Sequence, residues 1–390
     1  MVTKSISKFI TDESTVVDEV DVELMEGEVL SLSNSYGDIS SELDTLSDNL
    51  TSLEQGLKSF ESFTEGMLET VGDDDWDRYT ANKYYTGAKA VLTASGIPVE
   101  SALGDYSFEA VEATETGGEN KEKIKEKAGE FKKKIVEAIK VVIARATELY
   151  NNLVDKAASI ANKLEAIGSG LESKITSLDF DKPIDIDGSP AWAGYLYIDD
   201  NLVSPPHQTL TKSRAVVKDF NENWSSAIKG ASADLLSGKE PTSIFSNNKV
   251  FEKMDLSGNV SITLTREGES VNTLKIVTDK KPIPTGQKVR TLSKQGAEVM
   301  AKAIKDSGVE LGKSTAKLKA VSDELKKLSN AKDLDKTKSD NIRKLVTISG
   351  DIQRKLMEEL LSSAKNAVKH ITTTLRMNKP TNNNETKEGE

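Results

Sequence analysis

The residues best placed by type and spacing to do chemistry are six aspartates in one stretch of the chain. They flank Trp192 on both sides and are Asp179, Asp181, Asp185, Asp187, Asp199 and Asp200. Paired carboxylates can hydrolyse glycosides or bind calcium. The alternation of aspartate with other residues in DFDKPIDIDG is equally typical of an exposed strand edge. Both interpretations stay open at this stage.

The two histidines, His207 and His370, are the other candidates, since the chain contains no cysteine. Without cysteine there is no disulfide, thiolate zinc site or cysteine nucleophile. His207 follows two prolines in a predicted loop, without a predicted acidic or nucleophilic neighbour. His370 falls late in a predicted helix, where a cation suits the helix dipole, which favours a structural role. No glycine-rich nucleotide-binding loop occurs.

The charge of the chain is unevenly distributed. The formal net charge is −11, and residues 1–109 contain 23 Asp and Glu against 6 Lys and Arg. The remainder carries +6, and residues 293–377 hold 18 Lys and Arg against 11 Asp and Glu. This asymmetry is typical of an acidic tail, a propeptide or a masking segment, although a solvated acidic helical domain would look the same. The lysine-rich faces favour sequence-independent contact with nucleic acid, or are ordinary solvated helix faces.

Apolar residues at helical spacing predict long amphipathic helices. A near-heptad seam consists of Ile39, Leu43, Leu46, Leu50, Leu53, Leu57, Phe60, Phe63 and Met67. It indicates a helix that packs on another helix, within the chain rather than as an oligomer zipper. The strongest signal is in residues 121–178, where apolar residues recur about every 3.6 residues. Gly168 and Gly170 mark a point where this element could divide into two helices.

The fold class that follows is mainly α, with long amphipathic helices, helical hairpins and a small α+β insert containing a β-hairpin near residues 260–277. The expected segments are an acidic, helical, propeptide-like domain (1–109), a flexible linker (110–120), one or two long helices (121–178), a mixed α+β segment (179–292), an antiparallel helical hairpin (293–377) and a disordered tail (378–390). No apolar run approaches the ~18 residues of a membrane span, and the N-terminus lacks the apolar region of a signal peptide. We therefore expect synthesis in the cytoplasm.

The linker carries the most specific short motif. Three triplets of the form small-x-Glu follow one another in Ser107-Phe108-Glu109, Ala110-Val111-Glu112 and Ala113-Thr114-Glu115. They lie where the chain changes from acidic to basic, beside the glycines at 117 and 118. An exposed linker of this kind is accessible to proteases.

This arrangement resembles the prohead-protease cleavage sites of large tailed bacteriophages, the myoviruses, and the plan of the chain resembles their internal head proteins. The resemblance implies cleavage after Glu109, between Ser107-Phe108-Glu109 and Ala110, with Glu112 and Glu115 as secondary sites. It also implies synthesis in a bacterial host and a place in the virion interior. The implied partners are the prohead protease, capsid shell or scaffold proteins, which the near-heptad seam would contact, and packaged DNA, touched non-specifically after processing. The mature body could be ejected with the genome.

Two rival functions remain. The long helices and the predicted β-hairpin could belong to a helical pore-forming or secreted effector protein, although the continuous apolar run Val141-Val142-Ile143-Ala144 is too short for insertion. A hydrolase built on the aspartates around Trp192 is the least supported alternative. We predict a structural protein that is not an enzyme, with no catalytic residues, metal site or cofactor.

Overall fold

The computed structural model describes residues 119–176, 180, 182–186, 188, 190–284, 288–331 and 336–378, and six helical positions between Lys83 and Thr93. From residue 119 to 143 the description covers the backbone alone. The seam at residues 39–67, most of the expected linker and the tail after residue 378 lie outside the described residues. The division of the chain into domains therefore stays a prediction.

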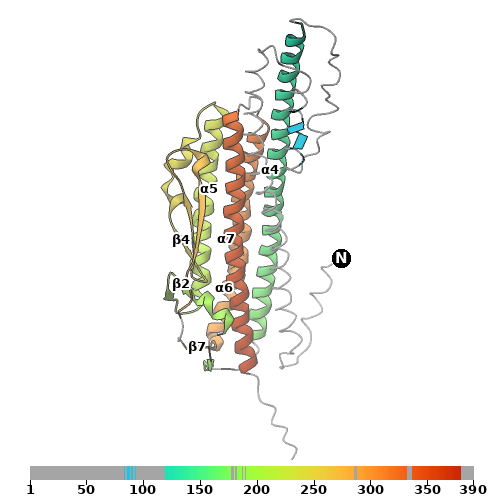
Figure 1. The fold of residues 1–390 in the computed structure, drawn as a ribbon. Helices are drawn as coiled ribbons and strands as arrows, with labels where there is room; N and C mark the ends of the chain where they lie inside the picture. Colours follow the sequence, from blue (N-terminus) through green and yellow to red (C-terminus); the bar gives the residue numbers. More distant parts are fainter. Residues whose placement is uncertain are drawn as a thin grey trace, which may run out of the picture.

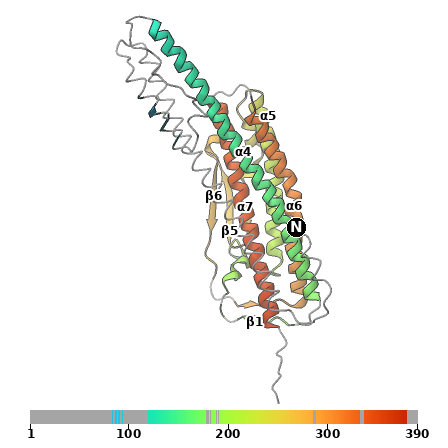
Figure 2. The same cartoon turned by 90° about the vertical axis from the view of Figure 1, so that its right-hand side faces the viewer.

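Four long helices of the described chain form an elongated bundle (Figures 1 and 2). They are α4 (Glu119–Thr176), α5 (Gln208–Leu236), α6 (Lys294–Ser329) and α7 (Lys336–Met377). Each buries an apolar stripe, as expected when helix stability comes from packing an amphipathic face rather than from propensity. The fold class predicted from the sequence, mainly α with a small α+β insert, is confirmed.

Polar contacts between the helices show which pairs are parallel and which are antiparallel. The hydroxyl of Ser322 on α6 donates to Asn151 on α4, and Lys305 on α6 pairs with Glu172 on α4 at 3.1 Å. Residue numbers rise along one helix as they fall along the other, so α4 and α6 are antiparallel. α5 and α6 are parallel, because Lys218 pairs with Glu310 one turn after Arg214 pairs with Asp306.

Small residues let α4 and α6 approach closely. A Cβ added to Gly168 would lie 2.5 Å from the backbone nitrogen of Lys305, and one added to Gly308 would lie 2.5 Å from the carbonyl oxygen of Ala161. The suggestion that Gly168 and Gly170 divide this element is wrong, because α4 is one continuous helix. A mid-helix glycine costs only about 1 kcal/mol, and the close packing that Gly168 permits favours keeping the helix intact.

Apart from α5, the described chain between α4 and α6 forms an insert of short antiparallel strands and short 3₁₀ helices. Its sheet has the order β4 (Met254–Leu256), β5 (Val260–Thr265) and β6 (Lys275–Lys280). The hairpin expected near residues 260–277 is the β5–β6 pair, in which Leu264 lies opposite Ile276.

Within the residues that the structure describes, two smaller strand pairs and four 3₁₀ helices complete the insert. The pairs are β1 (Asp185–Ile186) with β7 (Val289–Arg290), and β2 (Tyr197–Ile198) with β3 (Asn201–Leu202). The 3₁₀ helices are η3 (Ala191–Leu196), η4 (Thr242–Ser246), η5 (Asn248–Phe251) and η6 (Val271–Thr273). The buried side chains of the bundle and the insert form one continuous hydrophobic cluster, so the two fold as one body.

α7 is the central helix, and it contacts α4, α5 and α6 as well as η3, η6 and the sheet. Because it has neighbours on most sides, its buried residues include polar ones such as Gln353, Ser363 and His370. The amide of Gln353 donates to Asn221 on α5 at 2.8 Å, which satisfies part of this buried polarity. Within the described residues, no helix is long and apolar enough to cross a bilayer.

Candidate functional site

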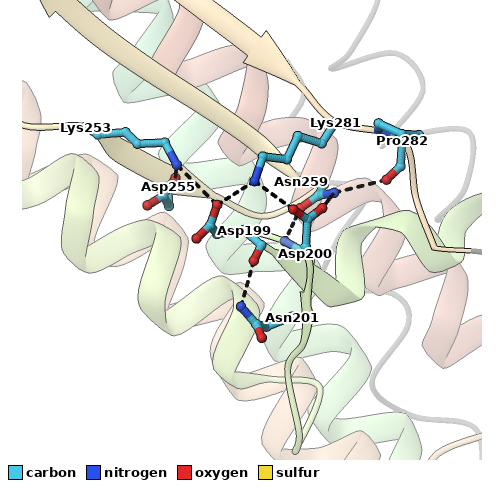
Figure 3. A network of polar contacts seen from close by, with 8 residues as sticks. All are labelled: Asp199, Asp200, Asn201, Lys253, Asp255, Asn259, Lys281 and Pro282. Atoms are coloured by element: carbon cyan, nitrogen blue, oxygen red, sulfur yellow. Dashed lines mark hydrogen bonds and ion pairs between the residues drawn. The ribbon is translucent and has the colours of Figure 1, made fainter.

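The turn of one hairpin and the loop of another meet in the insert, in a polar network that includes two of the predicted aspartates, Asp199 and Asp200 (Figure 3). Asp199 and Asp200 form the two-residue turn between β2 and β3, both with positive φ values of 47° and 63°. Two successive left-handed residues define a type I′ turn, and Asp tolerates that conformation better than most residues. The turn therefore directs both carboxylates away from the short strands.

Asn259, in the loop between β4 and β5, holds this turn in place. It is 2% exposed, and it also has a positive φ, of 60°. Its side-chain oxygen accepts from the backbone N–H of Asp200 at 2.7 Å, and its amide donates to Asp200 Oδ1 at 2.8 Å and to the Pro282 carbonyl at 3.2 Å. Its backbone N–H donates to the carbonyl of Tyr197 at 3.1 Å. One buried amide thus joins three segments of the insert.

Two lysines neutralise the aspartates. Lys281, which follows β6, lies 2.8 Å from Asp199 Oδ1 and 2.7 Å from Asp200 Oδ2. Lys253 lies 3.2 Å from Asp199 Oδ1 and 2.7 Å from Asp255 Oδ1. Hydrogen bonds from Lys281 lower the pKa of both turn carboxyls, with help from Lys253 at Asp199 and from Asn259 at Asp200. Both aspartates are therefore ionised at neutral pH.

This chemistry suits a structural tie better than a catalytic or metal site. Carboxylates held by ammonium groups are neither free bases nor protonated acids. In the described part of the chain, no group of three or more His, Cys, Asp or Glu side chains is arranged to hold a metal ion.

The structure also separates the predicted aspartates. Asp185 pairs with Arg290 at 2.6 Å across the β1–β7 ladder, apart from the network that holds Asp199 and Asp200. Asp179, Asp181 and Asp187 lie outside the described residues. The strand-edge interpretation of DFDKPIDIDG is correct for Asp185, which is an exposed residue of β1.

His370 has a structural role, but not as a cation. It is 1% exposed, and its ring stacks on Trp192 with the centroids 4.3 Å apart. Nδ1 lies 2.8 Å from the hydroxyl of Tyr195, and Nε2 lies 2.8 Å from the carbonyl oxygen of Arg290. Burial lowers its pKa to about 4. The expected favourable charge at the helix end is therefore wrong, because a desolvated imidazole is neutral at pH 7.

His207 directly precedes Gln208, the first residue of α5, and it is half-buried. Its carbonyl oxygen accepts from the backbone N–H of Thr211 at 3.3 Å. Its place just after Pro205 and Pro206 agrees with a role in starting the helix, where proline is common.

The sequence alone did not indicate which residues contact Asp199, Asp200 and His370. Asn259, Lys253 and Lys281 were not singled out, and neither was the contact of His370 with Trp192. The run Ser257-Gly258-Asn259 between apolar residues is a turn signal that could have indicated the β4–β5 loop. No local signal connects Asp199 with Lys281, which is 82 residues further along the chain.

A comparison of the sequence with models of known protein families gives a match over almost the whole chain. A family model for phiKZ-like phage internal head proteins matches residues 15–381. The chain belongs to this family. Comparisons with curated proteins and with solved structures found no match. As an internal head protein it is a structural component of the phage head interior, which confirms the resemblance of the chain to phage internal head proteins.

The residues predicted to form the cleavage site lie outside the described residues. They are Ser107, Phe108, Glu109, Ala110, Glu112 and Glu115. The described bundle begins shortly after them, with α4 at Glu119. Their role as a processing site stays a prediction.

Proposed function

We propose that this internal head protein enters the prohead with its acidic N-terminal segment attached and is then cut after Glu109 by the prohead protease. The observation that carries the proposal is the position of the triplets. Glu109, Glu112 and Glu115 directly precede Glu119, where α4 begins. Cutting there removes 23 of the 63 acidic residues but only 6 of the 52 basic ones, and it leaves all four helices of the bundle intact.

The mature body, residues 110–390, then lies among packaged DNA as a structural component. The net charge of this body is +6, compared with −11 for the whole chain. Phosphate-directed contacts by lysine need no base recognition, which suits a protein that meets every sequence of the genome. While the acidic segment is attached it competes with phosphate for the same lysines, and contacts with shell or scaffold proteins keep the protein in the prohead. The body can leave the head with the genome at ejection.

The test is the N-terminus of the protein in mature particles. Peptide mass spectrometry of purified virions is expected to find a new N-terminus at Ala110, with minor species at Ala113 or Thr116. Peptides from residues 40–90 are expected to be strongly depleted relative to those from the bundle. Abundant peptides that span an uncut linker would overturn the proposal.

A further inference from the structure

α4 extends far beyond its partners in the bundle. It has 58 residues, whereas α6 has 36 and α7 has 42. The contacts of Asn151 with Ser322 and of Glu172 with Lys305 set the register, in which the end of α6 lies opposite about residue 145 of α4. Residues 119–143 therefore run past the bundle, and both views of the molecule show this overhang (Figures 1 and 2).

The overhang has a heptad pattern in its sequence. Its apolar residues at steps of 4, 3, 4, 3 and 4 are Ile124, Ala128, Phe131, Ile135, Ala138 and Val142. On a helical backbone this spacing puts all six in one stripe, as in the a and d positions of a coiled coil. The stripe continues into the part of α4 that α6 covers, but α6 ends before it reaches the overhang.

A matching stripe occurs in the N-terminal segment of the same chain. The residues Ile39, Leu43, Leu46, Leu50, Leu53, Leu57 and Phe60 follow steps of 4, 3, 4, 3, 4 and 3. Two helices with the same heptad period can interlock their a and d side chains along their whole shared length. The two stripes are of similar length, about three heptads each.

The charges beside the two stripes are complementary. In the heptads of the overhang, four of the six e and g positions carry Lys125, Lys127, Lys132 and Lys134, and the other two carry Ile139 and Val141. In the N-terminal stripe the charged e and g residues are Glu42, Glu54 and Glu61. Charges at e and g select the partner of a coiled coil. Two copies of either stripe would bring like charges together, so pairing of the N-terminal stripe with the overhang is favoured over pairing of two identical stripes.

We propose that residues 39–60 pair with the overhang of α4, residues 119–143, as a two-helix coiled coil within one chain. The inference deepens the proposed function and rests on it for its biological role, because this contact would cover the lysines of the overhang until residues 1–109 are removed. It assigns the N-terminal seam to α4, instead of to a shell or scaffold protein. The 58 residues between the two stretches are long enough to allow either orientation of the pair.

The contact can be measured in the purified full-length chain, which has no native cysteine. Asp48→Cys and Lys133→Cys lie near the middle of the two stripes, on the side of each helix away from its apolar residues. The distance between spin labels at these positions is therefore similar in a parallel and in an antiparallel pair. Dipolar spectroscopy is expected to give one narrow distance on the order of 30 Å, since packed helix axes lie about 10 Å apart. The distance is expected to persist when labelled protein is diluted with unlabelled protein. A broad, long distribution, or loss of the distance on dilution, would overturn the inference.

Reversing the charges at the e and g positions distinguishes this specific pairing from a general attraction between the acidic N-terminal segment and the basic overhang. The variant Glu42→Lys, Glu54→Lys and Glu61→Lys is expected to lose the narrow distance, and adding Lys125→Glu, Lys127→Glu and Lys132→Glu is expected to restore it. The matched control Glu23→Lys, Glu26→Lys and Glu28→Lys makes the same charge change outside the stripe and is expected to keep the distance. Loss in the control, or persistence in the first variant, would refute the pairing. Circular dichroism confirms that every variant keeps the helical bundle.

The measurement needs neither protease nor DNA, so it is independent of the proposed function. A missing contact would refute the coiled coil and leave the cleavage at Glu109 untouched. An uncut chain in mature particles would refute the processing and leave the contact standing.

Discussion

Gly308 of α6 lies against the backbone of α4 so closely that a Cβ there would come within 2.5 Å of the Ala161 carbonyl oxygen. The neighbouring atom belongs to a helix backbone, which cannot rotate out of the way as a side chain can. The close approach of α4 and α6 at this point therefore depends on the absence of a Cβ methyl group at residue 308.

Gly308→Ala is accordingly expected to destabilise the protein by about 1–3 kcal/mol, the usual cost of overpacking a well-packed contact. Urea unfolding followed by circular dichroism measures this change. The control is Gly170→Ala in α4, where an added Cβ meets nothing within 4 Å. That change is expected to stabilise by about 0.5–1 kcal/mol, because alanine favours the helix. Equal effects at the two sites would mean that the close contact does not matter.

The stability of the bundle is expected to fall as the pH is lowered from about 6.5 towards 4, because of His370. Its folded pKa of about 4 lies below the ordinary value of 6.5, so in this range the unfolded chain binds the proton more readily. The loss is on the order of 3 kcal/mol for a shift of this size. His370→Gln is expected to flatten this part of the pH profile. A profile that is identical in the variant and the original protein would contradict the assignment to His370.

Asn259→Gly is expected to destabilise the insert by about 1–3 kcal/mol, because the buried side-chain hydrogen bonds are lost while the positive φ remains allowed. Asn201→Gly, in the same region, removes only an exposed bond to the Asp199 carbonyl and is expected to cost much less. Thermal unfolding measures both. A larger effect at Asn201 than at Asn259 would show that the network is not held by its buried amide.

Cleavage is expected to tolerate the loss of one site, because the triplets are redundant. With Glu109→Ala the cut moves to Glu112 or Glu115, whereas replacing all three glutamates leaves residues 1–109 attached. Gel analysis of particles from phages that carry each variant distinguishes the two outcomes. Normal processing of the triple variant would show that the protease recognises another sequence.

Binding of duplex DNA is expected to be weak, independent of sequence and stronger for the protein recovered from mature particles than for the full-length chain. The affinity of the processed form is expected to fall steeply with added salt, because phosphate contacts release counterions. Fluorescence anisotropy with two unrelated duplexes across a salt titration measures this. Equal affinity of the two forms at every salt concentration would remove the masking argument.

Periodicity was enough to predict the long helices and the β5–β6 hairpin, because an amphipathic pattern is local information. It was not enough for the contacts between them. The pairing of Asp199 with Lys281 and the stacking of His370 on Trp192 depend on how distant segments meet, and burial then changes the charge of His370. Gly168 is a further example. The low helix propensity of glycine suggested that the helix would be interrupted there, whereas in the structure the missing side chain allows α4 to pack closely against Lys305 of α6.

The order of the helices along the chain has a consequence for synthesis. α4 ends at Thr176 and its main partner, α6, ends at Ser329, about 150 residues later. At roughly 5–20 residues per second, a ribosome needs on the order of 10–30 s to close that gap. During this time the apolar stripe of α4 has no α6 to pack against. While translation continues, that stripe can be covered only by the part of the chain that has already been made, which includes all of residues 1–109.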